Sequence, residues 1–219
     1  TKYEKDRKIP KKKIRAQELI MDLLKERAET GRIYIMNIDH CNTHSSFKDK
    51  VYMSNLCQEI TLPTKPIQHI DDSQGEIALC ILSAINLGLI KEKDELEELC
   101  DLSVRALDEI IDYQEYPVQA AKISTEARRS LGIGYIGLAH YLAKLKLNYN
   151  DKQAWKEVDE LTENFQYYLL KASNEIAKEK GQCDYFHKTK YSDGILPIDT
   201  YKKEVDEISS RKLTMKWEQ

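Results

Sequence analysis

The sequence predicts an α/β fold, because two kinds of hydrophobic pattern follow one another along the chain. Apolar residues recur at helical spacing over residues 14–30, 94–112 and 155–180. Between the first two of these segments, residues 76–88 are almost wholly apolar, which is typical of a parallel strand covered on both faces. Strands separated by helices indicate an α/β arrangement.

The first predicted helix ends at Gly31, a residue type common just after a helix because it adopts the left-handed conformation easily. Its apolar stripe consists of Ile14, Leu19, Ile20, Leu23, Leu24 and Ala28. The following residues, 32–37, are rich in Ile and Tyr and predict a strand.

The two later helices have clear boundaries. Asp94, followed three residues later by Glu97, is a helix-start signal. The residues predicted to face inward from this helix are Leu96, Leu99, Cys100, Val104, Leu107 and Ile111. The last helix ends before Gly181. Its predicted inward residues are Trp155, Val158, Leu161, Phe165, Tyr168, Ala172 and Ile176.

Composition excludes several classes of function. Charged residues make up 32% of the 219 residues and apolar residues 41%, which is ordinary for a globular protein. A net charge of −3 gives no field that would attract nucleic acid or an anionic membrane. The longest apolar runs stay well below the ~18 residues that a transmembrane helix needs. Five cysteines at irregular spacing favour a reducing compartment, so we expect a cytoplasmic protein.

The segment from Asn55 to Glu59 is the strongest candidate for chemistry, because the Cys57 thiol lies between an amide and a carboxylate. If the segment is extended, these three side chains share one face at spacings of about 6–7 Å, suitable for contacting different atoms of one sugar ring. If it is helical, Cys57 points elsewhere. Cys57 could also be a small buried hydrophobe, but burying an amide and a carboxylate beside it would be costly.

Further motifs surround this segment in a fixed order. They are Gly31–Ile35, Asp39–Ser45, Ser54–Ile60, Leu62–Pro66, Gly75–Cys80, Asn86–Gly88, Leu131–Gly134, Tyr167–Glu175 and Gly194–Lys203. Together, from about Asp22 to Trp217, they resemble the large subunit of aerobic (class I) ribonucleotide reductases. The resemblance covers only a central portion of that family's longer chain.

This resemblance implies a fold that periodicity alone does not show. The strands would belong to a ten-stranded α/β barrel, with Cys57 on a loop inside it. All 219 residues would form part of one catalytic domain. Residues 1–30 would be a lead-in helix, residues 31–90 would hold strands and the loop with the radical cysteine, and residues 91–219 would be mainly helical.

The resemblance also implies an activity, the reduction of ribonucleoside diphosphates to deoxyribonucleotides for DNA synthesis. Cys57 would be the thiyl radical that removes the 3′ hydrogen atom, since S–H and ribose C–H bonds are close in strength. Glu59 would accept the 3′-hydroxyl proton, and Asn55 would hold the same edge of the sugar. The whole stretch, with Leu56 and Gln58, would lie against the nucleotide.

Two thiols must supply the electrons for this reduction, and by resemblance Cys80 is one of them. From its apolar surroundings alone, Cys80 would be taken as core filler. Its partner in the family lies upstream of this sequence, and Cys41, Cys100 and Cys183 do not match it. Cys100, on a helical apolar stripe, is expected to be buried and inert. Cys41 and Cys183 have no assigned role.

Three other signals are interpreted as structural. The G-x-G-x-x-G pattern at 132–137 lacks the preceding strand of a dinucleotide site, so we expect close helix packing there. His40, Cys41 and His44 lack a second ligand pair at zinc-like spacing, and we expect no metal site. Tyr167 and Tyr168 lie in a predicted helix, with Tyr168 in the core rather than in a radical relay.

The partners follow from the resemblance. A metal-containing small subunit would generate the radical, and thioredoxin or glutaredoxin would restore the thiols. ATP and deoxynucleotide effectors would bind regions outside this sequence, and no cofactor would bind within it. The isolated chain is therefore expected not to turn over, whether it is an excised fragment or a split-gene product.

The alternative is a degenerate or split remnant that serves as a non-catalytic assembly module, although the intact Asn55, Cys57, Glu59 and Cys80 favour the enzyme.

Overall fold

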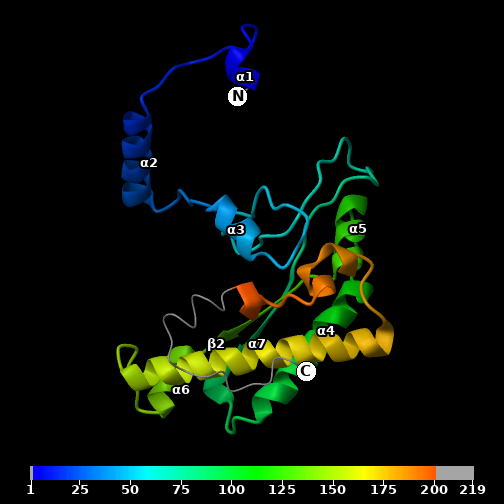
Figure 1. Ribbon diagram of the computed structural model, residues 1–219. Helices are drawn as coiled ribbons and strands as arrows, with labels where there is room; N and C mark the ends of the chain where they lie inside the picture. The colour runs from blue at the N-terminus through cyan, green and yellow to red at the C-terminus, as the bar shows by residue number, and fades with distance from the viewer. Residues whose placement is uncertain (1, 201–219) are drawn as a thin grey trace.

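The structure is a computed structural model that describes residues 2–200 as a helix-rich α/β segment (Figure 1). The longer helices are α2 (Ala16–Thr30), α4 (Glu95–Tyr113), α5 (Gln119–Arg128) and α7 (Lys152–Lys180). The shorter ones are α1 (Lys2–Lys5), α3 (Ile38–His44), α6 (Leu138–Lys144), η1 (Leu87–Leu89), η2 (Phe186–Lys188) and η3 (Lys190–Asp193). The predicted helical region extends to 219, and its residues 201–219, with the last three residues of the Gly194–Lys203 motif, lie outside the described part.

Two parallel strands, β1 (Ile81–Asn86) and β2 (Leu131–Ile136), form the sheet of the described residues. They pair in register from Ile81 opposite Leu131 to Asn86 opposite Ile136. Helices α4 and α5 connect the two strands, as a parallel pair requires. The prediction of an α/β segment is therefore confirmed.

The three predicted helices are present, but the apolar stripe of α2 is uncovered. Gly31 ends α2 in the left-handed conformation with φ of 66°. No residue of α2 is buried, and Leu19 and Ile20 are 52% and 53% exposed. Figure 1 shows this helix standing apart from the helices around the sheet.

The predicted strand over residues 32–37 is wrong. These residues form an irregular connection from α2 to α3, because no strand of the described part lies beside them to pair with their backbone groups. A high strand propensity describes how well side chains pack on a sheet that already exists, so it does not by itself create a ladder.

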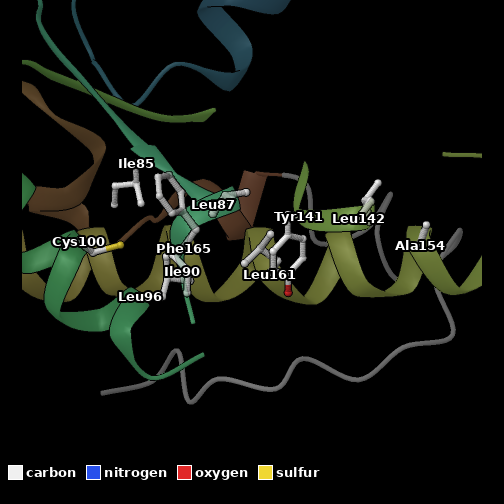
Figure 2. Packing of buried hydrophobic residues seen from close by; sticks show 10 residues of the cluster. All are labelled: Ile85, Leu87, Ile90, Leu96, Cys100, Tyr141, Leu142, Ala154, Leu161 and Phe165. Atoms are coloured by element: carbon white, nitrogen blue, oxygen red, sulfur yellow. The ribbon is translucent and has the colours of Figure 1, made fainter. Parts of the chain in front are cut away.

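The main core lies between the sheet and the long helix α7 (Figure 2). Helix α4 contacts both strands and packs along α7. The buried cluster consists of Ile85, Leu87, Ile90, Leu96, Cys100, Tyr141, Leu142, Ala154, Leu161 and Phe165. Ile133 and Tyr135 of β2 pack against it, as do Val158 and Tyr168 of α7, so the predicted core position of Tyr168 is confirmed. Trp155, predicted to face inward, is instead 59% exposed.

The sheet is covered on one face only, which corrects the prediction of a strand buried on both faces. Ile85 is 6% exposed, whereas Leu82 on the opposite face is 60% exposed. Alternate residues of a strand point to opposite faces, so Cys80 lies on the same side as Leu82, away from the helical core. The sheet thus presents the Cys80 side chain on its uncovered face.

The glycine pattern at 132–137 coincides with β2 itself, so the predicted close packing against a helix is wrong. Gly132 lies against Leu82 and Cys80 of β1 and its lead-in. Gly137 ends the pattern with φ of 75°, where the chain turns into α6. Glycine here permits close approach of two strands and a tight turn.

Cys100 is fully buried, and we predict that it resists alkylation in the folded protein. Burial, followed by the negative charge of Glu97, raises its pKa to about 12. Because the thiolate is the reactive form, iodoacetamide at pH about 8 should leave Cys100 unmodified in the native state and modify it after denaturation. Mass spectrometry of the alkylated peptides measures both states. Equal rates in the two states would contradict the prediction.

None of the helices in residues 2–200 combines the length and the apolar character that a bilayer crossing requires.

Candidate active site

The segment around Cys57 forms a tight, closed loop. Asn55 O accepts a hydrogen bond from Gln58 N (3.1 Å), and Gln58 has a positive φ of 63°. At the base, Asn55 Oδ1 accepts a bond from Ile60 N (3.0 Å), while Ser54 Oγ donates to Ile60 O (2.7 Å). The loop therefore presents Cys57 at an exposed turn.

This geometry differs from the extended segment considered from the sequence, and also from the helical one. The turn at residues 55–58 means that the three side chains do not alternate along a straight strand. In residues 2–200, no hydrogen bond joins the Cys57 thiol to Asn55 or Glu59. Asn55 has a structural task that the sequence did not suggest, since its side-chain oxygen closes the loop.

The structure brings Glu59 near Cys80, although the two lie on different segments. Cys80 is half-buried just before β1. Burial, and then the negative charge of Glu59, raises the pKa of the Cys80 thiol, so the two groups are close enough to interact electrostatically. A raised pKa favours the protonated thiol over the thiolate.

The start of the loop is anchored to helix α3. Asn42 of this helix donates from Nδ2 to Val51 O and accepts at Oδ1 from Val51 N, both at 2.9 Å. Val51 itself is fully buried. This pair of bonds fixes one residue of the chain three positions before Ser54, where the closed loop begins.

The other end of the loop is anchored by a buried ion cluster centred on Glu76. Lys65 and Glu76 exchange backbone hydrogen bonds of 3.0 and 3.1 Å, and Lys65 Nζ lies 2.5 Å from Glu76 Oε1. Arg128 of α5 donates to Glu76 Oε2 from Nε (3.0 Å) and from an Nη atom (2.7 Å). The same Nη atom donates to Asp49 (2.8 Å), so one guanidinium joins both limbs of the segment that carries Cys57.

The charges of this cluster are strongly coupled. Burial alone would raise the pKa of Glu76, but hydrogen bonds from Lys65 and Arg128 outweigh it and hold the pKa below its ordinary value. Glu76 is 2% exposed and Arg128 is 8% exposed. The Arg128 guanidinium also lies over the rings of Tyr185 (5.0 Å) and Phe47 (5.9 Å). These contacts explain how a charged group is tolerated there.

Sequence reasoning missed the role of this cluster. Its signals were an acid at the start of an otherwise apolar stretch, Glu76, and the adjacent cations Arg128 and Arg129. Nothing in their spacing indicates that Glu76 and Arg128 meet, because the pairing depends on how α5 returns to the sheet.

The other candidates lie on helices α3 and α7. His40 and His44 stack on α3 with ring centroids 6.2 Å apart. Within residues 2–200, no three His, Cys, Asp or Glu side chains gather in a way that could hold a metal ion. Tyr167 and Tyr168 contact edge to face at 5.8 Å within α7.

The described residues form a helix-rich α/β segment that carries an exposed cysteine loop, and comparison with known proteins assigns the family. The barrel domain of ribonucleotide reductase matches residues 1–219, and the chain belongs to this family. It is 57% identical to the ribonucleoside-diphosphate reductase subunit alpha of Buchnera aphidicola (from Schizaphis graminum) over 219 residues. It is 56% identical to the reductase 1 subunit alpha of Escherichia coli K12 and 42% identical to the subunit alpha of Enterobacteria phage T4.

These alignments cover 98–100% of this chain but only 28–29% of each relative. The chain is thus similar to one segment of the class I alpha subunit, and the resemblance in the sequence motifs is confirmed. The predicted fold is likewise confirmed as a helix-rich part of the family's barrel domain.

Proposed function

We propose that this chain is the central catalytic segment of a ribonucleoside-diphosphate reductase large subunit, forming part of one barrel domain. The observation that carries the proposal is the approach of Glu59 to Cys80, seen in the effect of the Glu59 charge on the Cys80 pKa. A carboxylate from the cysteine loop thereby interacts electrostatically with a half-buried thiol just before β1, on the side of the sheet that the helices leave uncovered. Family membership supports this assignment.

Each of these residues has its own role in the proposed reaction. Cys57, at the exposed turn, removes the 3′ hydrogen atom of the ribose as a thiyl radical. Glu59 accepts the 3′-hydroxyl proton. Asn55 holds the sugar edge and the loop, and Leu56 and Gln58 complete the surface against the nucleotide. Cys80 supplies one proton and one electron for the reduction, and the second thiol of the pair supplies the other proton and electron.

The remaining partners are part of the same proposal. The substrate is a ribonucleoside diphosphate, and the rest of the large subunit closes the barrel around the site. The metal-containing small subunit provides the radical, thioredoxin or glutaredoxin provides reducing equivalents, and ATP or deoxynucleotides bind elsewhere in the large subunit. We place the assembled enzyme in the cytoplasm.

The uncovered apolar surfaces support a larger assembly. In α2, Ile20, Met21 and Leu24 are 48–59% exposed. The face of β1 that holds Leu82 is also open, at 60% exposure of that side chain. Because the relatives are more than three times as long as this chain, further sequence of the large subunit is the simplest cover for both surfaces.

Replacing Glu59 by Gln tests the proposal in a large subunit that contains this sequence, assayed with its small subunit. We expect kcat for CDP reduction to fall about 10²–10⁴-fold, since Gln cannot accept the proton, with little change in KM. The substitution also removes the negative charge that raises the pKa of Cys80, so that pKa should fall and alkylation of Cys80 at fixed pH should become faster.

Glu92→Gln is the matched control. Glu92 is an exposed acid that follows β1 in the chain, and it has no role in the proposed chemistry. Unchanged turnover of the Glu59→Gln enzyme would contradict the assigned role. The alternative, a non-catalytic assembly module, predicts a complex of all subunits that never reduces CDP, even with the unsubstituted sequence.

A further inference from the structure

We infer that Gly132 is a positioning residue for the Cys80 thiol. The absence of a side chain at position 132 leaves the space in which the Cys80 sulfur lies. The link from this packing to turnover rests on the proposed function, whereas the packing itself does not.

The register of the sheet places the two residues on one face. Gly132 is the partner of Leu82 in the parallel ladder, and Cys80 precedes Leu82 by two positions. A methyl group on Gly132 would lie 2.9 Å from Cys80 Sγ and 2.5 Å from Leu82 Cδ2. Both separations are well below the ~3.5–4.0 Å at which non-bonded heavy atoms pack best. The exposed end of the Leu82 side chain can move aside, whereas relief of the second contact requires a shift of the half-buried sulfur or of the backbone.

Gly134 shows that this requirement is specific to one position. It lies two residues further along β2, on the same face, and a methyl group there would meet no atom within 4 Å. Neither glycine has a positive φ, so neither is needed for an unusual backbone conformation. The distinguishing property of Gly132 is therefore the room that it leaves for the side chains of Leu82 and Cys80.

The proposed reaction explains why the sulfur needs that room. Two thiols together give up two hydrogen atoms and join in an S–S bond, while the ribonucleotide exchanges its 2′-hydroxyl for hydrogen and releases water. Cys80 must hold its sulfur toward the sugar and then turn it to meet the second sulfur. A methyl group at position 132 would occupy part of the space for both positions.

Gly132→Ala and Gly134→Ala, each in the complete large subunit, form the test pair. For Gly132→Ala we expect the alkylation rate of Cys80 by iodoacetamide to change several-fold and kcat for CDP reduction to fall about 10²-fold, as a displaced reacting group would cause. Gly134→Ala should match the unsubstituted enzyme in both measurements.

A double-substitution cycle keeps the inference testable if Gly132→Ala folds poorly. Thermal unfolding is compared for Gly132→Ala alone, Cys80→Ala alone and both together. If contact with the sulfur is the cause, Gly132→Ala should lower the Tm less when Cys80 is already Ala. The contact with Leu82 is present in both backgrounds and does not affect this comparison.

The outcomes separate the inference from the proposed function. A changed alkylation rate, or coupling in the cycle, together with lost turnover supports both. The same structural changes with normal turnover support the positioning of Cys80 by Gly132 and overturn the role of Cys80 in the reaction. If Gly132→Ala changes the alkylation of Cys80 no more than Gly134→Ala does, and the Tm cycle shows no coupling between Gly132 and Cys80, the inference is overturned, whatever happens to turnover.

Discussion

Replacing Cys57 by Ser in the complete large subunit is expected to abolish CDP reduction. Serine is close to cysteine in size, so the turn closed by Asn55 and Ile60 should remain intact. An O–H bond is much stronger than an S–H bond, however, and a hydroxyl cannot take the place of the thiol as the carrier of the radical. The expected result is turnover below detection with nearly unchanged binding of CDP.

The measurement needs both turnover and binding. Turnover is measured as deoxycytidine diphosphate formed in the presence of the small subunit and a dithiol reductant, and binding by equilibrium titration of CDP. Cys41→Ser is a suitable control, because Cys41 is a partly buried thiol on α3 with no part in the proposed chemistry. Normal turnover by the Cys57→Ser enzyme would remove the central residue from the proposal.

The sequence predicted the helices well because their signals are local. Helix α4 begins beside Asp94, and its buried residues follow the predicted stripe, including Cys100. Helix α2 shows the limit of the same reasoning, since periodicity identifies an apolar face without saying what covers it. The predicted strand at 32–37 failed for a related reason, because a strand exists only where a neighbour supplies hydrogen bonds.

The candidate site was predictable as a set of residues and much less so as a geometry. The amide, thiol and carboxylate were identified by their chemistry, but alternate spacing suggested a straight segment where Gln58 adopts a positive φ and the chain turns. The approach of Glu59 to Cys80 depends on how the loop returns to the sheet. Such long-range contacts leave no periodic signal in the sequence.

Removing the Arg128 side chain is expected to loosen the whole loop anchor. Arg128→Ala would leave the buried Glu76 carboxylate with Lys65 as its cationic partner and would break the bond to Asp49. Breaking one partner of a buried ion pair typically costs about 3–5 kcal/mol. Lys65 is half-exposed and stays in place, so the local loss of stability should lie near the lower end of this range.

Hydrogen exchange within the large subunit measures this loss directly. The amide protons of Lys65 and Glu76 are bonded to each other's carbonyl oxygens, so their protection reports the opening of the anchor. Lys122→Ala on the same helix α5 is the control, because its pair with Glu126 is exposed and should contribute at most about 0.5 kcal/mol. Equal protection in the two variants would contradict the anchoring role of Arg128.

The dependence on pH provides an independent check. In the folded protein the pKa of Glu76 is lower than its ordinary value. The ionised Glu76 carboxylate therefore stabilises the fold fully at pH values above the ordinary carboxyl pKa, and this stabilisation is lost as the pH falls through the pKa of Glu76 in the folded state. Without Arg128, burial still opposes ionisation of the Glu76 carboxyl, and Lys65 is the remaining cation that favours it. The pKa of Glu76 should therefore rise. Protection of the Lys65 and Glu76 amides should therefore begin to fall at a higher pH in Arg128→Ala than in the unsubstituted protein. An identical pH profile would mean that the guanidinium does not control the charge of Glu76.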